Sequence, residues 1–224
     1  MSVAAVARRV FLTGGTGYVG SRLIPLLLQR KHSVRAIVRP SSLDKLPDGC
    51  ETVVGSVFDR ASLRDSMAGC DTVVQLVGVP KPAPWKGPQF RAVDQVSALA
   101  AIGAANDAGI RHFIYVSVAH PAPIMKEYIA VRAVCEAALR ATGLPATIVR
   151  PWYVLGPGHR WPLLLKPGYW VCERLHSTHD SARRLGLVTI YHMLATLLHA
   201  VDHPPDQVRV IEVPDIRAAG QGSR

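Results

Sequence analysis

The chain has 224 residues, of which 49% are hydrophobic and 19% charged, and this composition excludes an intrinsically disordered protein. Lys and Arg together number 26 against 16 acidic residues, but the basic residues are scattered and form no run interleaved with aromatic residues. That distribution argues against nucleic-acid binding. No apolar stretch reaches the ~18 residues of a membrane-spanning helix, and the first nine residues lack a signal-peptide core.

The cysteines are too widely spaced to suggest a metal site or a disulfide framework. None forms a Cys-x-x-Cys pair with another, and the four are Cys50, Cys70, Cys135 and Cys172. Reduced thiols are typical of an intracellular compartment. We therefore expect a cytoplasmic protein that has no metal and no integral membrane span.

Short apolar runs alternate with helical patterns along the first two thirds of the chain. The runs predict strands over residues 9–13, 34–38, 52–54, 72–77, 112–116 and 146–149. Apolar residues at helical spacing predict helices over residues 18–30, 60–68, 90–108 and 125–141. The alternation predicts an α/β fold, a doubly wound parallel sheet with helices on both faces. Continuous apolar strands are typical of a sheet that is buried on both faces.

The pattern changes after Pro151, where closely spaced Gly and Pro residues indicate irregular chain. We predict a helix over 190–201, a strand over 208–213 and a frayed tail over 218–224. The chain is interpreted as one domain, residues 1–224, in which residues 151–190 form an irregular substrate or cap segment. The apolar stretch 161–171 within it is expected in the core, with a substrate, a subunit or a membrane surface as alternatives.

A glycine-rich turn joins the first strand to the first helix, and it includes Gly14, Gly15, Thr16, Gly17, Tyr18, Val19 and Gly20. Gly15-x-Gly17-x-x-Gly20 has the spacing of a dinucleotide-binding turn. The middle glycine lets the backbone approach the pyrophosphate, and Gly20 lets the helix lie close to the sheet. N–H groups at the helix start then hold the phosphate charge. The strand and helix around the turn favour this function over a flexible loop.

The end of the second strand bears on which dinucleotide is bound. NAD sites usually place an acid here for the adenosine ribose, whereas this chain has Arg39, followed by Ser41 and Ser42. A guanidinium suits the 2′-phosphate of NADP, and the serines can add hydrogen bonds. We therefore predict NADP over NAD, with a solvated strand-end charge as the alternative for Arg39.

These segments, in this order, resemble the atypical short-chain dehydrogenases/reductases, of the kind related to nitrogen-regulator-like and epimerase-like proteins. The resemblance covers about residues 10–158 and returns more weakly over 188–213. Besides the glycine turn, it rests on residues 34–39, 55–59, 71–78, 112–117 and 149–158. It implies a Rossmann-type sheet with the cofactor along the carboxyl ends of the strands, and the changed pattern after Pro151 adds a small C-terminal cap.

The resemblance also implies further cofactor residues. Asp59, or its neighbour Val57, would lie near the adenine, and Leu76, Val77 and Gly78 would line the ribose side. Pro151 and Tyr153 would border the nicotinamide and a small-molecule substrate. Asp59 has an alternative role as the N-cap of the following helix, and Leu76 and Val77 have one as plain core.

Reductases of this family use a Tyr-x-x-x-Lys pair on a helix and a Ser at the end of the preceding strand. Here Tyr128, Arg132 and Ser117 take these places, with Tyr128 as proton donor, Arg132 as the supporting cation and Ser117 on the substrate oxygen. Residues four apart share a helix face, so Tyr128 and Arg132 can meet. Arg in place of Lys, and a short loop before Tyr128, depart from the pattern. His120 in that loop is a substitute acid.

Two functions follow from this assignment. The first is an NADP-dependent oxidoreductase or epimerase-like enzyme that acts on a carbonyl or hydroxyl carbon. The second is a non-catalytic dinucleotide-binding regulator or assembly factor, in which the altered catalytic pair supports no turnover.

Overall fold

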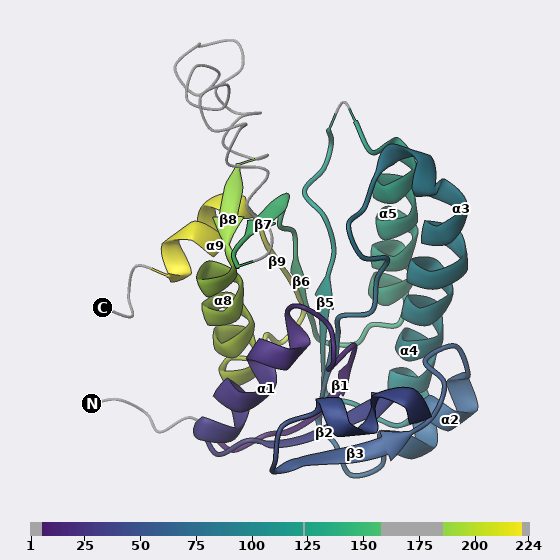
Figure 1. The fold of residues 1–224 in the computed structure, drawn as a ribbon, viewed down its shortest axis with the longest axis vertical. Helices are drawn as coiled ribbons and strands as arrows, with labels where there is room; N and C mark the ends of the chain where they lie inside the picture. The colour runs from purple at the N-terminus through teal and green to yellow at the C-terminus, as the bar shows by residue number, and fades with distance from the viewer. Residues whose placement is uncertain (1–5, 123, 158–185, 221–224) are drawn as a thin grey trace.

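A computed structural model describes residues 6–122, 124–157 and 186–220 (Figure 1). Its main sheet has seven strands, and every neighbouring pair is parallel. In spatial order the strands are β3 (Cys50–Val54), β2 (Ser33–Val38), β1 (Arg9–Thr13), β4 (Thr72–Gln75), β5 (His112–Val116), β6 (Ala146–Val149) and β9 (Val208–Ile211). The predicted α/β class with a doubly wound parallel sheet is confirmed.

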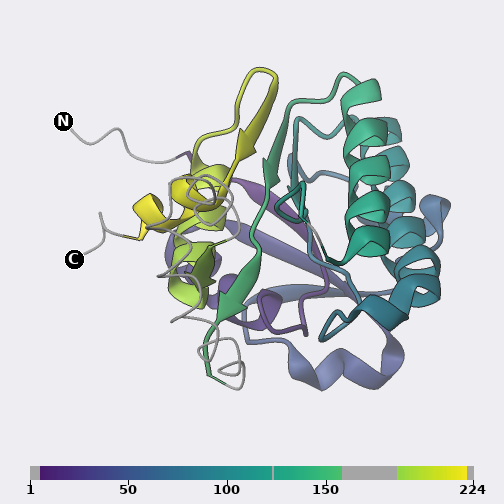
Figure 2. The ribbon, with the colours of Figure 1, turned by 90° about the horizontal axis from the view of Figure 1, so that it is seen from above.

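Helices cover both faces of this sheet, as Figures 1 and 2 show. One face carries α1 (Gly20–Gln29) and α8 (Ile190–Asp202), and the other carries α2 (Arg60–Ser66), α4 (Val96–Asp107) and α5 (Lys126–Ala141). Alternate strand residues point to opposite faces. Val10 and Leu12 of β1 therefore join the core under α1 and α8, while Phe11 joins the core under α4 and α5. Burial on both faces explains why the strands read as continuous apolar runs.

The predicted helix over residues 90–108 is not one regular α-helix. The chain passes through η2 (Pro84–Lys86) and α3 (Gly87–Gln89), then through a π-helical segment, η3 (Phe90–Gln95), before α4 begins. Asp94 lies in this π-helical segment and is fully buried. A π-helical turn inside a helix often marks a functional site.

The C-terminal third also differs from the prediction. Part of the expected irregular segment is a small parallel sheet, in which β7 (Tyr153–Leu155) pairs with β8 (Leu187–Thr189). The prediction that a frayed tail begins at residue 218 was wrong, because α9 (Val213–Ala219) continues to residue 219. The apolar stretch 161–171 and Cys172 lie outside the described residues.

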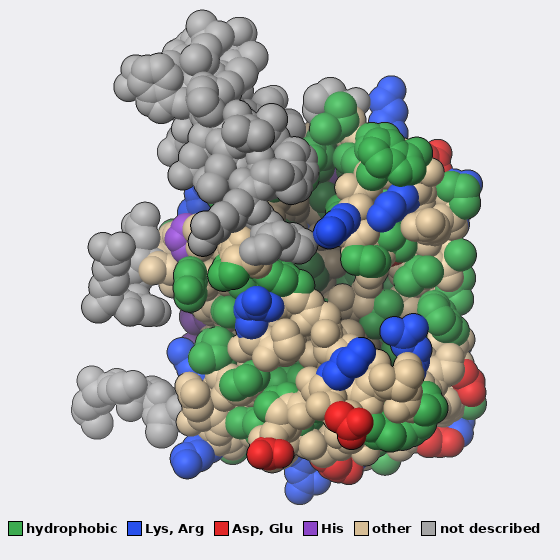
Figure 3. Space-filling model, viewed as in Figure 1, with side chains coloured by type: hydrophobic (Ala, Val, Ile, Leu, Met, Phe, Trp, Pro, Cys, Tyr) green, Lys and Arg blue, Asp and Glu red, His purple; other side chains and the backbone are tan. Residues whose placement is uncertain are grey.

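Among the described helices, none combines the length and the apolar character that a bilayer crossing requires. Cys50, Cys70 and Cys135 are free thiols. The described part of the chain also holds no group of three or more His, Cys, Asp or Glu arranged for a metal ion. On the face seen in Figure 3, Lys and Arg side chains are spread from top to bottom of the surface.

Candidate active site

A cleft of about 780 Å³ lies at the carboxyl ends of β1, β2, β3 and β4. Its walls are the glycine turn and the chain segments that leave the other three strands, because parallel strands end at the same edge of the sheet. Nine of the predicted cofactor residues line it: Gly14, Thr16, Gly17, Arg39, Ser42, Val57, Leu76, Val77 and Gly78. The structure therefore gathers residues from four separate segments around one cavity of dinucleotide size.

The glycine turn has a geometry that side chains would disturb. Gly14 has a φ of +71°, and a Cβ there would lie 3.0 Å from the carbonyl carbon of Leu76. At Gly20 a Cβ would overlap the carbonyl oxygen of Gly14 and lie 2.8 Å from Cα of Gly15. The start of α1 can thus approach β1 closely. No described side chain caps the first turn of α1, in which Ser21 N–H donates to the Gly17 carbonyl at 3.0 Å and Arg22 N–H donates to the Val19 carbonyl at 3.1 Å. What this helix start offers a phosphate is therefore the positive end of the helix dipole.

Arg39 is exposed at the end of β2, where it begins η1 (Pro40–Lys45). Ser42 N–H donates to the Arg39 carbonyl at 2.9 Å, which closes the turn, and Ser42 is buried while Ser41 is exposed. Among the described residues that line the cleft, Arg39 is the one with a charged side chain. The described lining of the cleft thus offers a cation and no carboxylate to an incoming ligand.

Several predicted cofactor residues do not line the cleft. Asp59 is the N-cap of α2, and its carboxylate accepts a hydrogen bond from Ala61 N–H at 3.0 Å, as the alternative interpretation expected. The ring of Tyr18 lies 4.3 Å from the Arg22 guanidinium. The remaining residues outside the cleft lining are Val19, Gly20, Ser41, Pro151 and Tyr153.

Tyr128 and Arg132 meet on α5, as their spacing predicted. Arg132 Nη2 donates to Tyr128 Oη at 3.1 Å, and the guanidinium carbon lies 5.0 Å from the centre of the Tyr128 ring. The ring is half-buried, and its centre lies 4.8 Å from that of Phe90. Val79 and Trp152 pack against the same small cluster. Tyr128 therefore lies where the chain leaving β4 and the chain leaving β6 come together.

The sequence analysis missed Asp94, which is the charge partner of Arg132. Arg132 Nη2 donates to Asp94 Oδ1, and Val79 N–H donates to Asp94 Oδ2 at 3.0 Å. A Cβ at Gly78 would lie 2.8 Å from Arg132 Nη2 and 3.0 Å from Asp94 Oδ1. The ion pair thus lies directly behind Gly78, a residue of the cleft wall. The sequence signal that could have indicated Asp94 was a single acidic residue within an Ala-rich helical pattern.

Burial and pairing act against each other in this ion pair. Burial raises the pKa of Asp94, and the Arg132 charge and the Val79 N–H limit the rise. Burial by itself would lower the pKa of Arg132, but Tyr128, Tyr115 and Asp94 together hold it above its ordinary value. Arg132 Nη1 also donates to Tyr115 Oη at 3.2 Å and to the Val116 carbonyl at 3.0 Å. Arg132 is therefore a fixed cation.

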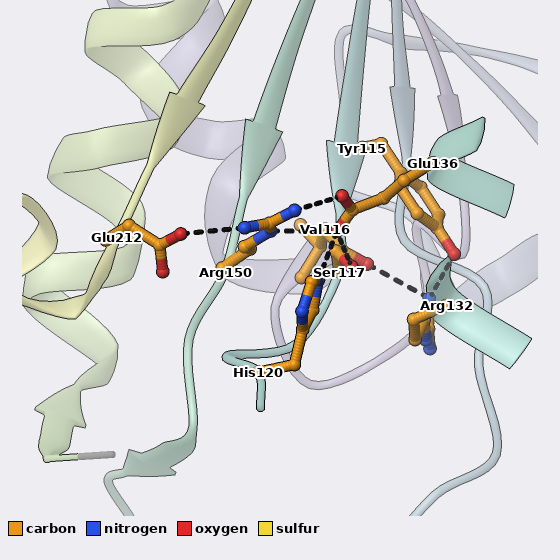
Figure 4. Close-up of polar contacts among 8 residues, drawn as sticks. All are labelled: Tyr115, Val116, Ser117, His120, Arg132, Glu136, Arg150 and Glu212. Atoms are coloured by element: carbon orange, nitrogen blue, oxygen red, sulfur yellow. Dashed lines mark hydrogen bonds and ion pairs between the residues drawn. The ribbon is translucent and has the colours of Figure 1, made fainter. Parts of the chain in front are cut away.

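Ser117 belongs to a second polar network, drawn in Figure 4. Its hydroxyl donates to Glu136 Oε1 at 2.6 Å, so it is directed at α5 and makes no hydrogen bond with Tyr128. Arg150 Nε donates to the same oxygen at 3.0 Å, and Arg150 Nη1 donates to Glu212 Oε1 at 2.8 Å. His120 Nε2 lies 3.6 Å from Glu136 Oε1. Ser117 and His120 thus contact Glu136, whereas Tyr128 contacts Arg132.

Glu136 is the centre of this network. Burial alone would raise the pKa of Glu136, but hydrogen bonds from Arg150 and Ser117 and the Arg150 charge hold it below its ordinary value. The carboxylate is therefore ionised and joins α5 to the ends of β5 and β6. Sequence reasoning missed Glu136 because nothing local distinguishes it from a surface acid.

Comparison with known proteins agrees with this geometry. Residues 14–160 match the family described as NAD(P)H-binding. The ceramide reductase of Caulobacter vibrioides is 32% identical over 151 residues, which are 66% of this chain and 47% of that protein. A 4-hydroxy-2-methyl-3-oxo-4-farnesyl-3,4-dihydroquinoline-1-oxide ketoreductase of Stigmatella aurantiaca is 28% identical over 170 residues, 66% of this chain and 51% of that protein. This chain thus spans about half the length of these two relatives.

Another relative is matched over more of its length. An uncharacterised sugar epimerase of Bacillus subtilis is 32% identical over 155 residues, 64% of this chain and 71% of that protein. Among solved structures, the Bordetella bronchiseptica enzyme WbmH in complex with NAD+ superposes with a TM-score of 0.68 at 20% identity, covering 92% of this chain and 76% of WbmH. The chain therefore belongs to the NAD(P)H-binding, atypical short-chain dehydrogenase/reductase family.

Proposed function

We propose that this protein is an NADPH-dependent oxidoreductase or epimerase-like enzyme that acts on a carbonyl or hydroxyl carbon. The observation that carries the proposal is the position of Gly78. It lines the cleft on one side and packs against the Arg132–Asp94 pair on the other, and Arg132 donates a hydrogen bond to Tyr128. A fixed acid/base group thus lies beside a cleft that suits a dinucleotide.

The residues present fit the dinucleotide. The positive end of the α1 dipole suits its pyrophosphate, and the close-packed glycines let the phosphates approach the backbone. Arg39 suits the 2′-phosphate, because the described lining of the cleft contains no acid that would repel it. When bound, the dinucleotide supplies or accepts the hydride.

The chain itself handles the proton. In the reducing direction Tyr128 Oη donates a proton to the substrate oxygen, and the tyrosinate that forms is stabilised by the Arg132 cation at 3.1 Å. Arg132 remains protonated, and Tyr128 regains its proton from solvent. Asp94 keeps the guanidinium in place through its second hydrogen bond to the chain after β4.

The surroundings of Tyr128 favour an apolar substrate. Phe90 packs against its ring, and Val79 and Trp152 pack against the same hydrophobic cluster. Two of the relatives are named as a ceramide reductase and as a ketoreductase of a farnesylated ring compound. We therefore propose a lipid-like carbonyl compound as the substrate class.

The test is turnover in the Tyr128→Phe variant. NADPH oxidation is measured with a panel of long-chain, steroidal and small ketones. The rate of the variant should be about 10²–10⁴-fold lower than that of the wild type, because the proton donor is gone. Tyr191→Phe, a change in an exposed tyrosine on α8, should leave the rate unchanged. Equal rates in wild type and Tyr128→Phe would contradict the assignment of Tyr128.

A second candidate function has its own supporting observation. The Ser117 hydroxyl is committed to Glu136, and the Arg132 charge is paired with Asp94, which together suit a dinucleotide-binding regulator without turnover. The same panel discriminates the two. NADPH at about one hundred times its Kd should stabilise the protein by ~2.7 kcal/mol in either case. Stabilisation without turnover across the panel would favour the regulator.

The preference for NADPH is tested at Arg39. Arg39→Asp should weaken NADPH binding by about 10–100-fold, the equivalent of a charge-assisted hydrogen bond, and weaken NADH binding much less. Arg140→Asp is the control, because Arg140 lies in the last turn of α5, which ends shortly before β6 begins and therefore at the amino edge of the sheet, away from the cleft. Equal losses for the two dinucleotides would rule out a 2′-phosphate role for Arg39.

A further inference from the structure

An exposed tryptophan lies five residues before Phe90, whose ring packs against that of Tyr128. Trp85 in η2 is 80% exposed, the highest value among the large hydrophobic side chains of the described residues. Ile124, two residues before α5, is 51% exposed. One exposed apolar side chain is ordinary, but exposed apolar side chains that lie together within a polar rim commonly mark a surface that binds something.

The two segments that carry these side chains lie together. A Cβ at Gly87, just after η2, would lie 3.4 Å from Cγ of Glu127 in the first turn of α5. Figure 3 shows hydrophobic side chains at the upper right, over the ends of α3 and α5, with basic side chains around them. We call this surface the Trp85 patch, and it consists of Trp85, Ile124, Lys81, Lys86 and Lys126.

The loop that presents Trp85 is braced. Lys86 Nζ donates to the carbonyls of Pro80 and Lys81 at 2.9 and 3.0 Å. Pro84 occupies the first position of η2, where its ring restricts the backbone. These contacts restrict the backbone on both sides of Trp85, so its side chain is exposed on a structured segment.

The charge of the patch is positive. It contains three of the six lysines in the chain. The neighbouring acid, Glu127, forms an ion pair with Arg91. Tryptophan at the boundary of an apolar phase, with lysines beside it, is the combination that an anionic bilayer surface accepts.

We propose that the Trp85 patch docks this protein on an anionic membrane surface, with the Tyr128 site turned toward the bilayer. Trp85 and Ile124 enter the headgroup region, while Lys81 and Lys126 lie against the lipid phosphates. Phe90 connects the two sites, since it follows α3 directly and packs on Tyr128. The consequence that an apolar carbonyl substrate enters from the bilayer rests on the proposed function, whereas the docking itself does not.

The experiment is co-sedimentation of the full chain with two kinds of vesicle, phosphatidylcholine alone and phosphatidylcholine mixed with phosphatidylglycerol. The protein should bind the mixed vesicles, and added salt should weaken the binding. Lys126→Gln should weaken it by about fivefold. Trp85→Ser should weaken it by at least about tenfold, because the largest apolar contact is lost.

Matched controls change the same residue types elsewhere. Lys31→Gln, in the turn after α1, and Tyr191→Ser, a 73% exposed aromatic on α8, should leave vesicle binding unchanged. Circular dichroism of each variant checks that it is folded. A failure of all variants to differ from wild type, or an absence of vesicle binding by wild type, would overturn the proposal.

Other occupants of the patch give different results. If Trp85→Ser turns a dimer into a monomer in size-exclusion chromatography and vesicles are not bound, the patch is a contact between copies of this chain and the proposal is wrong. If Trp85→Ser raises KM for a water-soluble ketone and leaves vesicle binding intact, Trp85 is a wall of the substrate site and the proposal is equally wrong.

The vesicle-binding test and the turnover test can each fail without the other, so the two proposals are distinguished. Tyr128→Phe should still bind mixed vesicles as wild type does, because it leaves the patch unchanged. Absence of turnover in wild type would contradict the proposed enzyme and leave the docking result standing. Absence of vesicle binding with normal turnover would contradict the docking alone.

Discussion

The two halves of the sheet's carboxyl edge are built in different ways. Around β1 to β4 the edge is a cleft, lined largely by glycines and apolar side chains, with Arg39 as the charged side chain among the described residues. Around β5, β6 and β9 the edge is filled by Ser117, Glu136, Arg150 and Glu212, which bond to one another. The first half leaves polar groups available to a ligand, and the second half uses them to join strands.

Arg132 and Asp94 stand at the boundary between these halves. They are buried, as Ser117 and Glu136 are, yet they pack directly behind Gly78 of the cleft. A buried charge is costly when its partner is missing. We therefore expect changes in the charged half to act on stability first, and changes in the cleft to act on ligand binding.

The largest effect is expected at the boundary. Asp94→Ala leaves Arg132 buried without its partner and should lower the free energy of unfolding by about 3–5 kcal/mol. Asp107→Ala is the matched control, because Asp107 pairs with Arg60 on the surface, and its effect should be far smaller. Urea denaturation measures both. Equal losses would show that the Arg132 environment is as solvated as the surface.

The next effect concerns Glu136 and pH. Glu136→Gln removes the charge that accepts from Arg150 and Ser117 and should cost about 2–3 kcal/mol at neutral pH. Because the folded-state pKa of Glu136 lies below its ordinary value of 4.5, its contribution is complete above that value and is lost as the pH falls through the folded-state pKa. Unfolding curves between neutral and acidic pH should therefore converge for wild type and variant. Parallel curves would contradict a lowered pKa.

A smaller loss of stability, accompanied by lost binding, is expected in the cleft. Gly20→Ala places a Cβ against the backbone of Gly14 and Gly15 and should cost about 1–3 kcal/mol. The shifted turn should also weaken dinucleotide binding, measured by titration of protein fluorescence. Gly143→Ala, at a φ of +70° in open space, should cost about 1 kcal/mol and leave binding intact. Unchanged dinucleotide binding in Gly20→Ala would show that the geometry of the glycine turn is not needed for binding in the cleft.

The smallest effect separates a cap from a ligand contact. Asp59→Ala removes the N-cap of α2 and should cost about 1 kcal/mol, with unchanged affinity for NADPH. Calorimetric unfolding and a binding titration report the two quantities. A fall in NADPH affinity would show that Asp59 contacts the cofactor as well as capping α2, and that the binding site reaches α2.

Much of the fold could be predicted from local patterns. The strands over residues 9–13, 112–116 and 146–149 begin and end where the apolar runs do. The glycine turn and the Tyr128–Arg132 pair were equally accessible, because a tight turn and a helix spacing of four depend on nearby residues alone. The family resemblance then implied a cofactor along the carboxyl ends of the strands, the edge at which the cleft lies.

The remaining features depend on contacts between distant residues. Asp94 meets Arg132 across 38 positions, and Ser117 meets Glu136 across 19, so no local pattern indicates either partner. The β7–β8 pair was missed for the same reason, since its three-residue strands lie far apart in the chain. The sequence by itself determined the family, the glycine turn and the helix pair. The tertiary structure decided that Asp94 holds Arg132 and that Ser117 faces Glu136, because burial leaves each charged group only the partners that the packed elements bring to it.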